Sequence, residues 1–310
     1  MSCSYSLQLR ELCYIRASNM GKLLFYIFVK PLSYLPLPIL YRLSDFFYLI
    51  VYYGIKYRKA VVFNNLRNAF PEKTEREITV IAKGFYSHFC DLIFEAVKMF
   101  SISEKELEQR CKILNPALME TYAQQGKSLI IPAGHYNNWE MAATASNQQI
   151  PHTSIGIYAP LKNKFINERI RVSRARFGME LLPKKEVKVG FERDKNRLTA
   201  VLFGADQSPT SARTAYWTTF LNQETGVMIG SEKYAKQYDY PVVFGKVMKI
   251  KRGYYEFEFI PLEDHPRETP FGEITEKHTR LLETIINENP QYWLWSHKRW
   301  KRKKPVSKSN

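Results

Sequence analysis

The stretch Ser128–Glu140, SLIIPAGHYNNWE, decides the fold that we expect of this chain. Its apolar run Leu129–Ile131 predicts a buried strand, which a glycine soon ends. Asn137 and Asn138 are good N-cap residues for the amphipathic segment Trp139–Ala145. We therefore expect a strand, a tight turn and a helix in succession, as in the open α/β sheets that place their chemistry at the carboxyl ends of strands.

His135 and Glu140 are the candidate catalytic residues of this stretch. They lie five positions apart, which on one continuous helix would set them roughly 140° apart. They can meet only if His135 lies in the strand-to-helix turn and Glu140 in the first helical turn. There the carboxylate could fix the tautomer of an imidazole base. No Ser or Cys stands beside His135, which favours direct base catalysis. The alternative is a structural turn histidine, with Glu140 stabilising the helix N-terminus.

The composition indicates a globular or membrane-associated protein with an acidic partner. Hydrophobic residues make up 45% of the 310 residues, too many for a disordered chain. The formal charge of +16 favours an anionic membrane surface, an acidic protein, a phosphorylated lipid or nucleic acid. Nucleic acid is not expected, because no zinc finger, RNP element or P-loop occurs. The cysteines have no metal-ligand or disulfide spacing, which indicates a reducing compartment; they are Cys3, Cys13, Cys90 and Cys111.

The first 60 residues differ in character from the rest. Residues 1–19 hold no apolar run long enough for a signal peptide, and Met20 resembles a natural start, so we interpret 1–19 as an optional or misassigned extension. Residues 20–60 are rich in aliphatic residues and Tyr, with basic residues and prolines between them. Their apolar runs are shorter than the roughly 20 residues of a spanning helix. We expect a monotopic membrane-associating helical segment; the alternative is a helical layer packed on a soluble core.

Helical and strand patterns alternate beyond residue 60. Thr74 and Glu77 have the spacing of a capping box and open a helix that runs to about Phe100. A second apolar strand, Leu198–Ala205, delivers polar side chains at its end, as the first strand does. The other expected elements are helices opened by Ser103 and Asn115, a strand at Thr153–Tyr158, a basic helix at Leu161–Phe177, a helix at Gly226–Tyr238, antiparallel strands at Pro241–Met248 and Tyr254–Ile260, and a helix at Gly272–Asn289.

Five motifs resemble, in their order along the chain, the late acyltransferases of lipid A biosynthesis, the lauroyl/myristoyl acyltransferase family. They are NNLRNAFPE (Asn64–Glu72), GHYNNWE (Gly134–Glu140), RARFG (Arg174–Gly178), ADQSP (Ala205–Pro209) and PQYWLWSHKRWK (Pro290–Lys301). The resemblance covers about residues 22–303. The family's GHFGNWE has Tyr136 and Asn137 in place of Phe and Gly here, and its FFG is Phe220–Asn222.

The resemblance implies transfer of an acyl chain from acyl-acyl carrier protein to a hydroxyl of a lipid A precursor, with no metal or redox cofactor. It places the protein at the cytoplasmic face of a bacterial cell inner membrane. It also implies a glycerolipid-acyltransferase-like α/β fold, a central mixed sheet flanked by helices, over residues 61–303, before a basic tail at 304–310. Alternatives are another acceptor (a glycerophospholipid, aminolipid or glycolipid), a hydrolase, and a basic membrane- or nucleic-acid-binding protein.

This chemistry gives the first motif a set of roles. His135 would be the general base, since a neutral imidazole suits proton removal near neutral pH. Glu140 would hold it in the right tautomer, as the acid of a catalytic triad does. Asn138 is assigned to substrate binding, because backbone N–H groups at the helix start near Asn137 and Asn138 could stabilise charge on the thioester oxygen.

Two later motifs supply the remaining candidate site residues. Arg174 and Arg176 are candidates for binding the acceptor phosphate or the carrier's phosphopantetheine, because guanidinium groups make bidentate phosphate contacts. A solvated helix face is the alternative for both. Asp206 and Gln207 are interpreted as acceptor-positioning residues; the alternative for Asp206 is a turn residue in a proline-containing loop.

Overall fold

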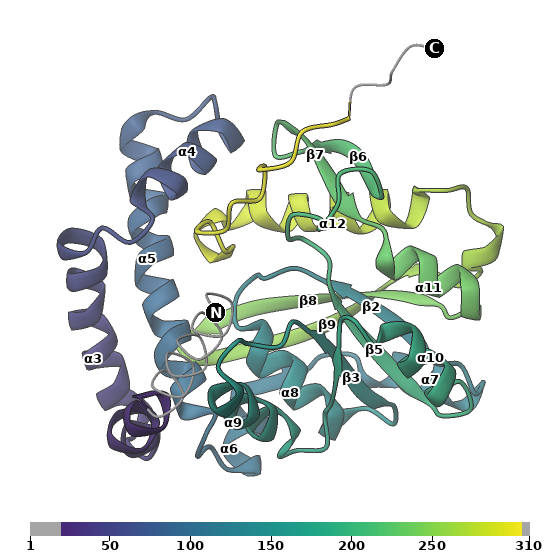
Figure 1. Ribbon diagram of the computed structural model, residues 1–310, viewed down its shortest axis with the longest axis horizontal. Coiled ribbons are helices and arrows are strands. Elements are labelled where there is room, and N and C mark those ends of the chain that lie inside the picture. The colour runs from purple at the N-terminus through teal and green to yellow at the C-terminus, as the bar shows by residue number, and fades with distance from the viewer. Residues whose placement is uncertain (1–19, 306–310) are drawn as a thin grey trace, which may run out of the picture.

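The computed structural model describes residues 20–305 and is built around a seven-stranded sheet (Figure 1). The strand order is β1-β9-β8-β2-β5-β3-β4, and neighbours run parallel except β8 and β9. The strands are β1 (Cys111–Ile113), β2 (Leu129–Ala133), β3 (Thr153–Tyr158), β4 (Glu180–Pro183), β5 (Thr199–Gly204), β8 (Val242–Lys251) and β9 (Tyr254–Glu263). The predicted mixed sheet is confirmed, whereas the predicted extension at 1–19 and the tail beyond residue 305 lie outside the described residues.

The central strand β2 is apolar on both faces because helices cover both sides of the sheet. Ile131 packs with Met141 and Phe257 on one side, and Ile130 packs with Phe191 and Ile274 on the other. A near-continuous apolar run is what a parallel strand buried on both faces requires. The first side carries α6 (Glu104–Arg110), α7 (Pro116–Gln124) and α8 (Trp139–Gln149), and the second carries α10 (Val187–Asp194), α11 (Gly230–Tyr238) and α12 (Glu273–Glu288).

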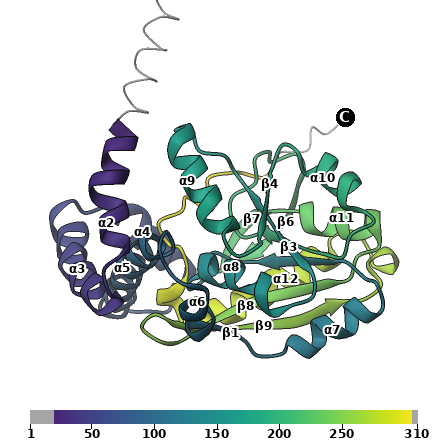
Figure 2. The same cartoon turned by 90° about the horizontal axis from the view of Figure 1, so that it is seen from below.

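The N-terminal helices gather with α5 at one end of the molecule (Figure 1 and Figure 2). Helix α5 (Glu75–Lys98) begins with the predicted capping box, in which Thr74 and Glu77 bond to each other's backbone. Against it lie α2 (Lys30–Ser33), α3 (Leu37–Leu49), η2 (Ile50–Gly54) and α4 (Lys59–Ala69), and η1 (Phe25–Val29) packs with α2. Within residues 20–305, none of the helices combines the length and apolarity needed to cross a membrane. The membrane-associating role of residues 20–60 stays a prediction.

Most expected elements occur, but the predicted start of the helix at Gly226–Tyr238 is four residues too early, since the helix begins at Gly230. Residues Gln223–Met228 form strand β7, which pairs antiparallel with β6 (Ala215–Phe220), and α11 starts at Gly230. The hairpin turns at Leu221 and Asn222, which both have positive φ (49° and 60°), as a tight hairpin turn demands. Helix α9 (Lys164–Ala175) lies within the expected basic segment, and the antiparallel pair β8–β9 is confirmed.

Candidate active site

The register between β2 and β5 brings two predicted site residues together. Ala133 of β2 pairs with Gly204 of β5 in a parallel ladder. His135 and Asp206 each lie two residues beyond that pair, so they leave the same edge of the sheet side by side. The carboxyl ends of parallel strands are the usual location of active sites in open α/β sheets.

Asp206 holds His135 through both its backbone and its ring. The Nδ1 of His135 lies 2.6 Å from one carboxylate oxygen of Asp206, and the backbone N–H of His135 donates to the other oxygen at 2.8 Å. Trp293 Nε1 donates to that second oxygen, also at 2.8 Å. Because the carboxylate accepts, Nδ1 carries the proton and Nε2 has the lone pair. The amide of Gln207 lies 3.0 Å from Nε2, as a donor to that lone pair.

The pKa values of His135 and Asp206 are shifted in the directions expected for a base and its anionic partner. Burial alone would lower the pKa of His135, but the charge and hydrogen bond of Asp206, with the charge of Glu140, outweigh burial and raise it above its ordinary value. Burial raises the pKa of Asp206, yet the neighbouring His135 and its hydrogen bonds lower it to about 2. A buried carboxylate that stays ionised favours protonation of the imidazole beside it.

Glu140 does not contact His135 in the predicted way. Both residues lie where the sequence placed them, in the turn and in the first turn of α8, but the Glu140 carboxylate forms an ion pair with Arg174 of α9. The hydrogen bond to Nδ1 comes from Asp206 instead. The expectation of a direct His135–Glu140 contact is therefore wrong, because the ring turns toward β5 and Glu140 faces α9. Glu140 acts on His135 through its charge.

The turn that carries His135 is fixed by backbone and side-chain bonds. Asn137 adopts a left-handed conformation (φ 52°), which Asn tolerates better than most residues. Its backbone N–H donates to the carbonyl of Tyr292, and its side-chain Nδ2 donates to the carbonyl of Val247. Asn138 caps α8 by accepting from the backbone N–H of Met141, which confirms the predicted N-cap. The backbone N–H of Asn137 is thus already used and is unsuited to the oxyanion role considered for it.

The two predicted phosphate-binding arginines are both engaged within the protein. Arg174 pairs with Glu140 across the gap between α9 and α8. Arg176 donates to the backbone carbonyls of Met99 and Ile102 at 3.2 and 2.9 Å and so fastens the end of α9 to the loop after α5. Arg174 borders the site, whereas these contacts give Arg176 a structural function.

An apolar cavity of about 410 Å³ opens beside the histidine. Its walls come from η1, α5, α8 and α9; they include Phe25, Ala96, Phe100, Trp139, Ile166 and Ile170. Asn138, Glu140 and Arg174 add polar groups to this lining. The ring of Trp139 lies 5.0 Å from the ring of His135, centroid to centroid. One wall residue, Trp139, therefore joins the candidate base to an apolar space large enough for a long chain, and this space has a few polar groups in its wall.

Two residues of the site were missed from the sequence. Trp293 orients Asp206, and Gly204 leaves room for the His135 ring, since a Cβ at that position would lie 3.0 Å from the ring's Cε1. The signal for Gly204 was available: a glycine at the end of a strand often permits close approach of another group. For Trp293 no local signal exists, because it meets Asp206 from a segment 87 positions along the chain.

A histidine held by a buried carboxylate near an apolar cavity, in an α/β fold, is an arrangement that can activate a hydroxyl or a water next to an apolar substrate, as in enzymes of acyl transfer or hydrolysis. The sequence pattern of the family described as "Bacterial lipid A biosynthesis acyltransferase" matches residues 14–302. The chain belongs to this family. It is also similar to the "Lipid A biosynthesis lauroyltransferase" of Escherichia coli (strain K12), at 22% identity over 269 residues, which cover 86% of this chain and 87% of that protein. Family membership supports acyl transfer in lipid A acylation.

Proposed function

We propose that this protein transfers an acyl chain from acyl-acyl carrier protein to a hydroxyl of a lipid A precursor, at the cytoplasmic face of a bacterial inner membrane. The observation that carries the proposal is the His135–Asp206 pair, whose imidazole packs against Trp139, a wall residue of the apolar cavity. No metal or redox cofactor is needed, because a thioester is already an activated acyl donor.

The reaction assigns one task to each group. The acceptor hydroxyl replaces the Gln207 amide at Nε2 of His135 and gives its proton to that nitrogen as its oxygen attacks the thioester carbon. Asp206 stabilises the resulting imidazolium. The first amides of α8, at Trp139 and Glu140, have no carbonyl partner within the helix and stabilise the negative oxygen. The tetrahedral intermediate then expels the carrier's thiolate, which takes the proton back from His135.

The cavity is the proposed site of the acyl chain, and a bulky residue in its wall tests this. Ala96 lines the cavity and its side chain is exposed to it, so Ala96→Trp fills space without disturbing the core. Excluding two methylenes at about 0.8 kcal/mol each lowers the preference for longer over shorter acyl donors by about tenfold. The kcat/KM for donors of stepwise chain length measures this.

The matched control is Ala117→Trp, on an exposed position of α7 that does not line the cavity. It should keep the wild-type order of donors. An Ala96→Trp enzyme that also keeps this order would exclude the cavity as the acyl site.

The acceptor is the least constrained part of the proposal. A glycerophospholipid, an aminolipid or a glycolipid would present the same attacking hydroxyl. Purified protein with acyl-acyl carrier protein and a lipid A precursor should give a product heavier by one acyl group in a mass spectrum. Lipid analysis of a deletion strain should show the same species losing one chain; loss from a different lipid would reassign the acceptor, and release of free fatty acid without acceptor would indicate a hydrolase.

The surface of the N-terminal helices supports attachment to a membrane. Within the described chain, 15 of the 22 exposed large hydrophobic side chains lie between Met20 and Tyr57. Exposed apolar groups concentrated in one segment in this way indicate an interaction site. Basic residues between them suit an anionic lipid surface.

Replacing two of these side chains should release the protein from lipid. Phe46 and Leu49 of α3 are 64% and 50% exposed, so Phe46→Ser with Leu49→Ser should leave folding intact. Burying such a side chain contributes roughly 1.5–3 kcal/mol, so the double variant should bind anionic vesicles at least about tenfold more weakly. Flotation with phosphatidylglycerol vesicles measures it. The matched control, Val189→Ser with Phe271→Ser, removes exposed apolar groups elsewhere; equal loss in both variants would contradict a docking face on α3.

A further inference from the structure

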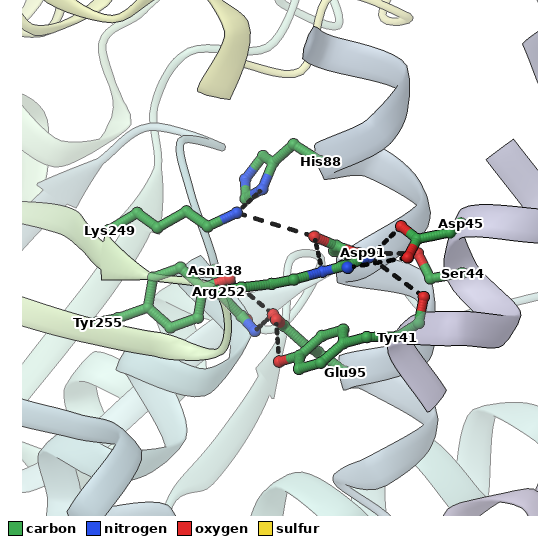
Figure 3. A network of polar contacts seen from close by, with 10 residues as sticks. All are labelled: Tyr41, Ser44, Asp45, His88, Asp91, Glu95, Asn138, Lys249, Arg252 and Tyr255. Carbon is green, nitrogen blue, oxygen red and sulfur yellow. Dashed lines mark hydrogen bonds and ion pairs between the residues drawn. The ribbon is translucent and has the colours of Figure 1, made fainter. Parts of the chain in front are cut away.

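A fully buried carboxylate that the proposed mechanism does not use, that of Glu95, lies in the last turn of α5. Glu95 is 0% exposed and receives three hydrogen bonds from three separate elements (Figure 3). Tyr41 Oη of α3 donates to one oxygen at 2.8 Å. Tyr255 Oη of β9 and Asn138 Nδ2 donate to the other oxygen at 2.8 and 2.7 Å. Burial raises the pKa of Glu95, while these hydrogen bonds act in the opposite direction. A buried carboxylate is costly unless its partners are well placed.

Glu95 determines which way the Asn138 amide points. The Oδ1 of Asn138 accepts from the backbone N–H of Met141 at 2.9 Å and caps α8, so its Nδ2 must face away from that helix. Glu95 offers only acceptors at this point and therefore selects the capping orientation. Asn138 lies three residues after His135, is 3% exposed and lines the apolar cavity. The contact thus controls the first turn of α8, whose amides are proposed to stabilise the oxyanion.

The same carboxylate joins this turn to the N-terminal helix. Beside the Tyr41–Glu95 bond, Ser44 of α3 donates to Asp91 at 2.8 Å, one helical turn before Glu95. Arg252, after β8, makes ion pairs with both Asp91 and Asp45 and so connects the sheet, α5 and α3 (Figure 3). The predicted boundary at residue 60 assigned Tyr41 to a membrane segment separate from the catalytic domain. These contacts place its hydroxyl two hydrogen bonds away from the turn that carries His135.

We propose that Glu95 is a positioning residue for acyl transfer, which orients Asn138 and the start of α8, and that Tyr41 makes this orientation depend on the seating of α3. The inference rests on the proposed function, because it assigns Glu95 to the same reaction. The N-terminal helices are then part of the catalytic unit in addition to being a docking surface.

The test measures kcat and KM separately for purified full-length protein in detergent, so that vesicle binding does not enter. In Glu95→Gln one acceptor oxygen becomes a donor, which opposes either Tyr41 or the Tyr255–Asn138 side. The kcat should fall about 10²-fold, as expected for a misplaced catalytic geometry, with KM changed less than about threefold. Tyr41→Phe removes one bond to a charged group and should lower kcat about tenfold. Tyr122→Phe is the matched control, because it removes the hydrogen bond of a buried tyrosine to a carboxylate, that of Asp264, and neither residue lines the cavity. This variant should keep the wild-type kcat.

A double variant that exchanges the carboxylate of Glu95 and the amide of Asn138 distinguishes a positioning role from a contribution to stability alone. Asn138→Asp in the Glu95→Gln background lets the amide introduced at position 95 donate to the carboxylate introduced at position 138, whose other oxygen can still cap α8. This double variant should recover at least about tenfold of the kcat lost in Glu95→Gln, as restored geometry requires. Variants that retain the wild-type kcat while losing only melting temperature would overturn the positioning role, provided that His135→Ala is inactive in the same assay. A wild-type protein without transfer activity would refute the proposed function and this inference with it.

Discussion

His135→Ala is expected to lower the rate of acyl transfer by about 10²–10⁴-fold, the contribution of a positioned general base. Without the imidazole, the acceptor hydroxyl has to lose its proton to water while it attacks the thioester. The ring is 20% exposed and its backbone N–H still reaches Asp206 in the variant, so the turn should keep its conformation. Single-turnover rates with saturating donor and acceptor measure the chemical step, and circular dichroism checks the fold.

His135→Asn provides the matched control for loss of structure. Its side-chain amide can occupy the place of Nδ1–H and donate to Asp206, but it offers no basic nitrogen at the position of Nε2. It should be as inactive as His135→Ala and closer to wild type in melting temperature. Wild-type rates in either variant would exclude His135 as the base.

Asp206→Asn is expected to lower kcat by up to about 10⁴-fold, the loss found when the acid of a catalytic triad becomes an amide. The amide can offer its NH₂ group to Nδ1 and so favour the tautomer with the proton on Nε2, which cannot act as a base. Glu140→Gln should cost less than about tenfold, because Glu140 bonds to Arg174 and reaches His135 only through its charge. A larger loss in Glu140→Gln than in Asp206→Asn would restore the His135–Glu140 pairing expected from the sequence.

Asp206→Asn and Glu140→Gln should both move the acidic limb of the kcat–pH profile in the same direction. The base must be neutral, so activity rises as the pH passes upward through the pKa of His135. Burial lowers that pKa, but Asp206 and Glu140 raise it overall. Removing the charge of Asp206 therefore moves the acidic limb of the kcat profile to lower pH, by more than removing that of Glu140. An acidic limb that stays in place in Asp206→Asn would contradict the pairing.

His135 and Asp206 also make the stability of the folded protein depend on pH. The contribution of His135 is lost as the pH rises, and that of Asp206 is lost as the pH falls. The folded pKa of His135 is raised, so its contribution is complete below its unfolded pKa of about 6.5 and is lost as the pH rises through the folded value. The folded pKa of Asp206 is lowered to about 2, so its contribution is present above its ordinary value of 3.8 and is lost as the pH falls toward 2. The ion pair therefore stabilises the protein most at mildly acidic pH.

The sequence predicts well those features that short stretches determine. The capping box of α5, the N-cap at Asn138 and the apolar strand before His135 follow from residues within a few positions of each other, and all three are found. The start of α11 was misplaced because the β6–β7 pairing, which the polar–apolar pattern alone does not reveal, takes residues up to Met228.

The arrangement of the candidate site depended on information that local patterns lack. Asp206 and Gln207 were predicted to be site residues, but their contact with His135 requires that β5 lies next to β2, and strand order cannot be read from spacing. Glu140 was chosen because it is near in sequence, whereas the true hydrogen-bond partner is near in space. The network around Glu95 was likewise hidden, since its three partners come from distant parts of the chain.

The pairing of β2 with β5 also affects when the candidate site forms during folding. His135 and Asp206 are separated by 71 residues, and Trp293 adds a third segment from near the C-terminus. Contacts between such remote segments require closure of long loops and form slowly during folding. His135 therefore meets Asp206 only when β5 has paired with β2, and Trp293 reaches Asp206 only when the last part of the chain has docked. A partly folded or still growing polypeptide would thus be unable to acylate lipid, and recovered activity after refolding reports completion of the whole fold.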